Sequence, residues 1–458
     1  MFFTEEEEKR KRQQSTMNFC LPTDVGSISR RQLLKHGSSL AAFMTGSQLL
    51  ASRYAIGQEA VDPIQRRLVW IMMNGGWDIL EVTDPKVAST PGIDMSYDWA
   101  LAQQVTGAPD GDKIGRWLSR TAGIGSDLVV VRGLNMKTTS HTAGRVYMDT
   151  GILSNSGDVN VASIPVIVAS QSEATIPMIQ LSGGMEALTD RATSNVSVVR
   201  AQNLELYRSM YPESDAELVQ KTAVLDHLRN SADRVEALIG SNDRLTAVKN
   251  AESKIRTQFQ NNVRSQLALT DEDMAAFRPT DGMRGNNGMT ETFAMAAKLI
   301  KNNLVTSLNL GVGNFDTHSN QEARMQPVVE NFDFMLSTFV NELRNSGDLD
   351  TTLICVVSDF GRTPLVNNGN GRDHWPVGGA LMLGGGIEGS RVVGATDDNL
   401  RALPINETTG AQDSSGVLID ASHLGGSVVD LCLGTDFYAE KRSGYLASIP
   451  ALTKLKTG

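Results

Sequence analysis

The chain has 458 residues, which is enough for one large α/β domain or for two domains. Its formal net charge is −10, and this excess of acidic residues argues against a nucleic-acid-binding protein, because such proteins present a basic face. Its three cysteines provide no disulfide framework, since Cys20 lies in a leader-like segment and we expect Cys355 and Cys432 to be inert buried thiols.

Residues 1–56 resemble a disordered leader that contains a bacterial twin-arginine export signal. Arg30 and Arg31 precede a short, weakly apolar stretch at 37–51, which predicts export by the twin-arginine translocase to the periplasm or outside the cell. The alternative is a basic amphipathic helix. The stretch is shorter than the roughly 20 apolar residues of a bilayer span, so we expect no transmembrane helix in the mature chain. No clear cleavage site follows it, which leaves a retained anchor open.

A first strand is expected at residues 67–73, where the sequence is Arg-Leu-Val-Trp-Ile-Met-Met. It breaks at Gly75 and Gly76, whose backbone freedom permits a sharp turn. The turn brings Asp78 over the carboxyl end of the strand, the edge at which open α/β sheets bind their ligands.

A second strand is expected at 127–131 and a helix at 145–150, with a hydroxyl-rich segment at 138–144 between them. Hydroxyls just before a helix are commonly N-caps, which is the interpretation that we favour for Thr138 and Thr142. The same geometry also points backbone N–H groups at an anion, so the segment is a candidate binding loop.

The stretch from 204 to about 277 changes to runs rich in Ala, Glu, Gln, Lys and Leu, with apolar residues at helical spacing. We therefore expect a helical insertion or cap there. A linker rich in Gly and Asn follows at 278–288, and a helix at 290–301 then leads back to the sheet.

A strand, a loop, a helix and a second strand come next. The strand at 304–310 runs into a loop with Asp316 and His318, a helix with one apolar face covers 325–343, and a buried strand follows at 351–358. This βαβ unit implies a parallel sheet.

Asp359 directly follows the strand at 351–358, and the glycine-rich loop at 367–376 then places Asp373 beside His374. A short strand at 380–383 and a closing helix at 427–433 are expected after it. Because the carboxyl ends of parallel strands meet at one edge, the polar loops after the two strands of the βαβ unit should converge on one site.

The candidate metal ligands are aspartates and histidines that follow strand ends. They are Asp78, Asp316, His318, Asp359, Asp373 and His374. Carboxylate oxygens mixed with imidazole nitrogens are the set expected for zinc, manganese or a similar divalent ion. Two such ions about 4 Å apart can clamp both oxygens of a phosphoryl or sulfuryl transfer, so we expect one or two ions. The alternative for any single Asp-x-His is a loop-capping aspartate beside a surface histidine.

Four motifs carry a resemblance to a known family. They are Asn-Phe-Asp-Thr-His-Ser-Asn-Gln (314–321), Ser-Asp-Phe-Gly-Arg-Thr-Pro (358–364), Gly-Arg-Asp-His-Trp-Pro (371–376) and Gly-Gly-Gly-Ile-Glu-Gly-Ser-Arg-Val-Val-Gly-Ala-Thr-Asp (384–397). With the twin-arginine leader, they resemble the domain-of-unknown-function family numbered 1501, of the alkaline-phosphatase-like superfamily. The resemblance covers about residues 66–450 and implies an α/β/α sandwich with a mostly parallel sheet, to which the helical insertion is added.

The resemblance also implies roles for the candidate ligands. Carried over residue by residue, the superfamily pattern makes Asp316, His318 and His374 ligands of one metal. It makes Asp359 and Asp78 ligands of a second.

Two positions depart from the superfamily pattern. Phe360 stands where the superfamily often has histidine, so the second metal loses a ligand or is absent. The nucleophile position, ten residues before Gly151, holds His141 in place of Ser, Thr or Cys. Either the neighbouring Ser140 or Thr142 acts as nucleophile, or His141 itself binds metal or phosphate, or the chemistry has been lost. No Cys-x-Pro-x-Arg sulfatase motif is present, so we expect no formylglycine.

The leading hypothesis is an exported, metal-dependent hydrolase of a small or polymeric phosphate or sulfate ester. Arg362 or Arg372 would stabilise the anion, or both are structural ion-pair partners. The alternative is a non-catalytic envelope or binding protein with a vestigial metal site on the same fold. A third hypothesis is that the chain is a metal-dependent mutase or transferase.

Overall fold

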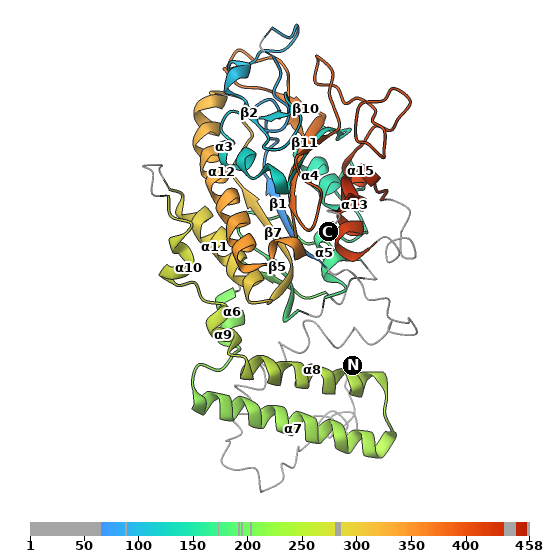
Figure 1. The fold of residues 1–458 in the computed structure, drawn as a ribbon. Helices are drawn as coiled ribbons and strands as arrows, with labels where there is room; N and C mark the ends of the chain where they lie inside the picture. The colour runs from blue at the N-terminus through green and yellow to red at the C-terminus, as the bar shows by residue number, and fades with distance from the viewer. Residues whose placement is uncertain are drawn as a thin grey trace, which may run out of the picture.

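The computed structural model describes residues 66–455 apart from 88, 173, 191–192, 194–195, 202–203, 280–284 and 435–445. The expected leader at 1–56, with its twin arginine and Cys20, lies outside the described residues. Within these ranges, no helix is long and apolar enough to cross a membrane. The expected mixed α/β class is confirmed (Figure 1).

In the described part of the chain, eight strands form one sheet in the order β12-β4-β11-β8-β1-β7-β5-β6. Neighbours run parallel except at β11, which is antiparallel to β4 and β8. The sheet is thus mostly parallel, as expected. The strands are β1 Arg67–Met73, β4 Leu128–Asn135, β5 Ile176–Gln180, β6 Val198–Arg200, β7 Val305–Val312, β8 Thr352–Ser358, β11 Val377–Gly384 and β12 Arg391–Val393. Two short ribbons add β2 Gln103–Gln104 with β3 Lys113–Ile114, and β9 Gly361–Arg362 with β10 His374–Trp375.

Helices cover both faces of the sheet. Val69 and Ile71 of β1 enter the core shared with α11 and α12, whereas Leu68 and Trp70 enter the core shared with α4, α5 and α13. Successive side chains of a strand point to opposite faces, so β1 lies between two helical layers, which Figure 1 shows on either side of the strands. The covering helices are α4 His141–Thr150, α5 Ile164–Ala169, α11 Asn287–Lys301, α12 Gln321–Ser346 and α13 Ala421–Leu433. Short helices are α3 Ser119–Gly123 and α15 Pro450–Thr453.

The expected helical insertion follows β6. Its helices are α6 Leu204–Ser209, α7 Asp215–Ile239, α8 Asp243–Gln260, α9 Val263–Gln266 and α10 Asp271–Ala275. The long helices α7 and α8 pack against each other, and Figure 1 shows this pair at the end of the molecule opposite β10. The pair therefore lies away from the loop that carries His374.

Helix α4 begins earlier than expected, at His141 rather than at residue 145. The N-cap position belongs to Ser140, whose extended backbone has φ −91° and ψ 124°, so the N-cap assignment to Thr138 and Thr142 is wrong. The Ser140 side chain makes no capping hydrogen bond, although the Thr138 hydroxyl accepts one from the Ser140 backbone N–H at 3.2 Å. The result is a helix whose first residue is a histidine.

Helix α13 is also longer than expected, because it begins at Ala421 rather than at residue 427. Gly425 and Gly426 concealed its first half, since glycine disfavours helix interiors. A Cβ on Gly426 would lie 2.2 Å from the carbonyl oxygen of Ala447, so close packing requires glycine there.

Strands β5, β6 and β12 and helix α5 have no counterpart in the sequence-based expectations. β5 contains Pro177, which lacks an N–H group, and the register skips this residue between Ile176 and Met178. β6 and β12 have three residues each, too few for a hydrophobic period. Tertiary pairing, not local pattern, therefore defines the edges of the sheet.

In the last turn of α4, the buried carboxyl of Asp149 accepts a 2.7 Å hydrogen bond from Trp70 Nε1, and its second oxygen has no partner among the described residues. Burial raises the pKa of Asp149 to about 7, although the bond from Trp70 opposes this shift. The unfolded chain loses this proton near the ordinary pKa, so the stability contributed at this site falls as pH rises from about 4 to about 7.

We expect Asp149→Asn to remove this loss, because the amide keeps an acceptor for Trp70 and carries no charge. The free energy of unfolding of the variant, relative to the wild type, should rise by roughly 3 to 4 kcal/mol between pH 4 and pH 8. Urea unfolding across that range measures it, with the exposed Asp158→Asn as control. Parallel pH profiles for the wild type and Asp149→Asn would contradict the prediction.

Candidate metal centre

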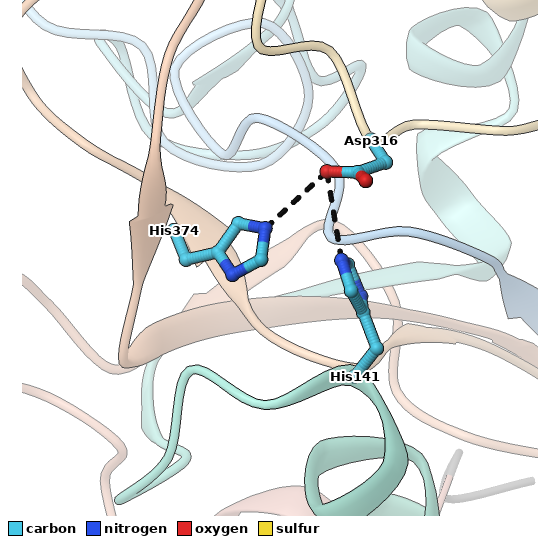
Figure 2. Close-up of side chains that lie close together, drawn as sticks. All are labelled: His141, Asp316 and His374. Carbon is cyan, nitrogen blue, oxygen red and sulfur yellow. Dashed lines mark hydrogen bonds and ion pairs between the residues drawn. The ribbon is translucent and has the colours of Figure 1, made fainter.

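Three side chains from separate elements meet at the carboxyl edge of the sheet. His141 begins α4, Asp316 lies in the loop after β7, and His374 begins β10. Nε2 of His374 lies 3.3 Å and Nε2 of His141 3.5 Å from the same oxygen, Oδ1 of Asp316, and Figure 2 shows both rings directed at it. One ligand atom of each residue lies within 4.8 Å of the others. We call His141, Asp316 and His374 the triad.

Asp359 holds the ring of His141 in place. Its Oδ2 lies 2.6 Å from Nδ1 of His141, and its Oδ1 accepts hydrogen bonds from the Gly76 backbone N–H and the Ser358 hydroxyl. Asp359 is fully buried at the end of β8, and a buried carboxylate needs such donors. Because Nδ1 carries the proton that Asp359 accepts, Nε2 is left as the free nitrogen that faces Asp316.

The second histidine is oriented in the same way by a backbone group. Nδ1 of His374 lies 2.8 Å from the carbonyl oxygen of Thr139, which can only accept. Nδ1 therefore carries the proton, and Nε2 again faces Asp316. Pairing of β10 with β9 sets His374 opposite Arg362, which places the ring at the edge of the sheet.

Asp316 receives several donors at one oxygen. Nη2 of Arg362 lies 2.8 Å and Nδ1 of His318 2.9 Å from Oδ1. Partial burial would raise the pKa of the Asp316 carboxyl, but the hydrogen bond and charge of Arg362, together with the imidazoles of His374 and His318 beside it, outweigh it and hold this pKa well below its usual range. Asp316 therefore stays ionised, as a metal ligand must be.

Aromatic rings surround the triad. The buried Phe360 stacks at centroid distances of 4.7 Å on His141 and 4.6 Å on His374, and His318 lies 4.7 Å from His374. Phe360, which stands where the superfamily often has histidine, forms an apolar wall. His318 lies beside the triad and contacts the same Asp316 oxygen, half exposed to solvent.

Asp78 lies apart from the triad, in a buried ion pair with Arg372. Its Oδ2 lies 2.9 Å from Arg372 Nε and accepts a 2.6 Å hydrogen bond from Gln321, while its Oδ1 accepts from the Leu80 backbone N–H. Both carboxylates expected to hold a second ion, Asp78 and Asp359, are thus bonded to protein groups.

Both arginines considered for anion binding are almost fully buried and bonded within the protein. Arg362 donates to the carbonyls of Gly75, Gly76 and Arg372 as well as to Asp316. Arg372 donates to three backbone carbonyls besides its ion pair with Asp78, namely those of Asp94, Thr363 and Pro364. The sequence left two roles open for these arginines, anion binding and structural ion pairing. The geometry favours structural ion pairing for both.

Three other candidates lie outside the triad. Asp373 is exposed, and its Oδ1 accepts a 3.0 Å hydrogen bond from Asn367. Ser140 and Thr142 flank His141 and are exposed, and among the described residues neither hydroxyl has a hydrogen bond to the triad. Their role as nucleophiles stays a prediction.

Supporting residues were not foreseen as part of the site. Gln321 links Asp78 to the Asp316 loop, because its Oε1 accepts a 3.0 Å hydrogen bond from the Thr317 hydroxyl. Gln321 is the last residue of the motif at 314–321, and this position in the motif could have identified it as part of the site. The Thr139 carbonyl is a backbone group, so no side-chain pattern could identify it.

The residues fit a divalent ion. Nε2 of His141 is buried and has no hydrogen-bond partner among the described residues, so a lone pair faces the Asp316 carboxylate with nothing bound to it. An ion between the three atoms would satisfy that nitrogen. Histidine ligands that donate their other N–H to a carboxylate or a backbone carbonyl are the usual arrangement at metal sites. Two imidazoles and one carboxylate suit zinc or manganese.

We expect His141→Ala and His374→Ala to lose the bound metal, because each removes one of the three converging ligands. Asp373→Ala should keep it, since Asp373 bonds to Asn367 outside the triad. Metal content after dialysis, measured by mass spectrometry, checks this. Retention of metal by both histidine variants, or its loss from Asp373→Ala, would contradict the assignment.

Asp359→Asn should weaken metal binding by about 10- to 100-fold without unfolding the chain, because the amide no longer fixes the ring and tautomer of His141. Titration calorimetry with zinc measures the affinity. The control is Asp84→Asn, which removes another buried carboxylate, 3.3 Å from Arg132 and outside the site. Equal zinc affinities in the two variants would refute the orienting role.

Comparison with solved structures gives similarity to alkaline phosphatases and sulfatases. The alkaline phosphatase from the Antarctic bacterium TAB5 is 14% identical, with a TM-score of 0.36 over 80% of this chain and 98% of that chain. The PsFucS1 sulfatase from Pseudoalteromonas sp. is 11% identical, with a TM-score of 0.38 over 94% of this chain and 76% of that chain. A protein in the alkaline phosphatase superfamily from Vibrio parahaemolyticus is 12% identical, with a TM-score of 0.33 over 86% and 79%.

In sequence, no curated protein matches the chain. One family model does match, and it covers residues 65–408, about three quarters of the chain. This range contains the triad and all four motifs in full, and the resemblance read from those motifs is confirmed. The chain belongs to the family described as protein of unknown function (DUF1501).

Proposed function

We propose that this chain is a metal-dependent hydrolase of phosphate or sulfate esters that holds one divalent ion, zinc or manganese, on the triad. The convergence of two oriented Nε2 atoms on Asp316 Oδ1 carries the proposal. When bound, a divalent ion polarises an ester oxygen and lowers the pKa of a water. In the hydrolysis, the water oxygen bonds to phosphorus or sulfur, the bond to the ester oxygen breaks, and one proton of the water ends on the released alcohol.

The chain's own residues preorganise this centre. Asp359 and the Thr139 carbonyl fix the two imidazoles, and Arg362 fixes Asp316 from a position with no solvent exposure. Groups held in place before the substrate arrives need no rearrangement during the reaction, which is the main source of electrostatic catalysis.

The N-terminus of α4 supplies donors for an anion at the same place. The helix begins at His141, and its first backbone N–H groups have no partner one turn earlier in the helix. Because the Ser140 side chain does not cap them, they remain available to a phosphoryl or sulfuryl oxygen beside the triad. The positive end of the helix dipole acts in the same direction.

The position of His141 favours water as the nucleophile. Its ring points to Asp316 from the place where the superfamily pattern has a hydroxyl or thiol nucleophile, and it is held there by Asp359. The proposal therefore assigns His141 to metal binding. Ser140 and Thr142 are then dispensable neighbours.

The second candidate function is a non-catalytic binding protein with the same metal centre. The observation that favours it is the replacement of the nucleophile by His141. For either function we propose export by the twin-arginine route, which the twin arginine at Arg30 and Arg31 supports.

Zinc- or manganese-loaded protein should hydrolyse aryl phosphate or aryl sulfate esters, lose this activity on chelation and regain it when metal is restored. His141→Ala should abolish the activity, whereas Ser140→Ala and Thr142→Val should retain it to within about tenfold, because a lost nucleophile costs several orders of magnitude more. Release of the chromogenic alcohol measures all four proteins. If the metal-loaded wild type is inactive on every ester, the hydrolase proposal is wrong and the non-catalytic binding protein is the better account. If Ser140→Ala is inactive, the nucleophile is the Ser140 hydroxyl and not water.

A further inference from the structure

We infer that the chain has a second binding site, for an uncharged carbohydrate, at the edge of the sheet opposite the triad. The site is a cavity of about 710 Å³, within the roughly 300 to 1,000 Å³ of small-molecule sites. The inference does not depend on the proposed ester hydrolysis, because no residue of the triad lines this cavity. We call it the amino-edge cavity, and its polar lining includes Arg67, Thr175, Asn261, Gln266, Asn302 and Asn303.

The amino-edge cavity lies where parallel strands begin. Arg67 is the first residue of β1, Thr175 immediately precedes β5, and Leu304 immediately precedes β7. The triad lies at the other end of the strands, at the carboxyl edge of the same sheet. Because β1 has seven residues at about 3.3 Å each, roughly 20 to 25 Å of sheet separates the two sites. A small molecule in the cavity therefore does not touch the triad.

The helical insertion forms the other wall of the cavity. Asn261 directly follows α8, and Val263 and Gln266 are the first and last residues of α9. The cavity thus lies between the strand starts and the insertion, and its shape depends on both. The insertion gains a role here that it does not have at the triad, since its long helices lie at the end of the molecule opposite β10 (Figure 1).

The lining of the cavity carries no unpaired charge. Its one charged residue is Arg67, whose Nη1 lies 3.2 Å from Oδ1 of Asp348. The same guanidinium donates to the Thr351 hydroxyl at 3.1 Å and to Oδ1 of Asn303 at 2.8 Å. The positive charge of Arg67 is therefore balanced by Asp348, and a charged ligand would meet no free counter-charge. These contacts favour an uncharged ligand, unlike the anionic ester proposed for the triad.

The polar groups that remain are amides and a hydroxyl. Among the described residues, the Asn261 amide and the Thr175 hydroxyl have no hydrogen-bond partner. Gln266 and Asn302 each donate their side-chain N–H to a backbone carbonyl, at 3.1 Å and 2.8 Å, which leaves their side-chain oxygens as acceptors. Asn303 accepts from Arg67 and keeps its N–H group as a donor. The cavity therefore offers both donors and acceptors.

This combination suits a carbohydrate better than a peptide. Each sugar hydroxyl both donates and accepts, so a carbohydrate can use donors and acceptors together without bringing a charge. The apolar part of the lining is small: it consists of Ala174, Val263 and Leu304, and the last two are buried. The cavity therefore provides little apolar surface for the side chains of a peptide or for a lipid chain.

The test is a ligand-observed NMR titration of the purified chain with three uncharged trisaccharides, namely maltotriose, cellotriose and triacetylchitotriose. No aromatic ring lies among the lining residues, so binding relies on hydrogen bonds, and we expect at least one sugar to bind with a Kd of about 1 mM or below. Triglycine with an acetylated N-terminus and an amidated C-terminus is the uncharged peptide for comparison, and it should bind at least about tenfold more weakly.

Variants place the binding at the cavity. Asn261→Ala and Gln266→Ala together should weaken sugar binding by about tenfold or more, because they remove polar groups of the insertion wall. The controls are Asn250→Ala, which removes an exposed amide of α8 outside the cavity, and His141→Ala at the triad. Both should keep the wild-type affinity for the sugar.

Four results would overturn the inference. They are no binding of any of the three sugars, tighter binding of the peptide than of the sugars, unchanged sugar binding by the double variant, and loss of sugar binding in His141→Ala. The last result would place the sugar at the triad instead of the amino-edge cavity.

Discussion

The contact between Asp359 and His141 is the interaction on which the rest of the site depends. It joins the end of the central strand β8 to the first residue of α4, across the layer boundary of the sandwich. A fully buried carboxylate is stable only with its donors in place, so the fold fixes Asp359, and Asp359 fixes the ring and tautomer of His141. The position of the His141 nitrogen that faces Asp316 is therefore set by the core of the protein and not by the surface loop around it.

A second buried network holds the loops of the other two triad residues, Asp316 and His374. Asp78, at the end of β1, bonds to Gln321 at the start of α12 and to Arg372 in the loop before β10. Those two partners flank the segments that carry Asp316 and His374, so one carboxylate ties both loops to the sheet. The same contacts occupy the Asp78 carboxylate and the Arg372 guanidinium within the protein.

The sequence predicts the architecture well where the local pattern is strong. β1, β7 and β8 read as buried apolar runs, α11 and α12 have a clear helical period, and their order implied a parallel sheet that the structure contains. β5, β6 and β12 were not predicted, because each depends on pairing with a distant neighbour. The antiparallel direction of β11 was equally invisible, since strand direction is not a local property.

The candidate site was likewise predictable where the signal is local and not where it depends on the folded structure. Asp316 and His374 stood out because they follow strands and sit beside other polar residues, and the structure brings them together. His141 was singled out by its distance from Gly151 in a family pattern. That pattern did not decide whether His141 binds a metal, binds phosphate or has no role in chemistry. Nothing in the sequence shows that Asp78 pairs with Arg372, nearly 300 positions away, because the pair exists only after the sheet has formed.

The most direct test of the central claim is anomalous X-ray diffraction at the zinc absorption edge, on crystals of the mature chain grown with zinc. We expect one strong peak within bonding distance of His141 Nε2, His374 Nε2 and a carboxylate oxygen of Asp316, with Asp359 still bonded to His141 Nδ1. The absence of a peak at the triad would contradict the metal centre itself. A second peak at Asp78 or Asp359 would contradict the proposal that the site holds one ion.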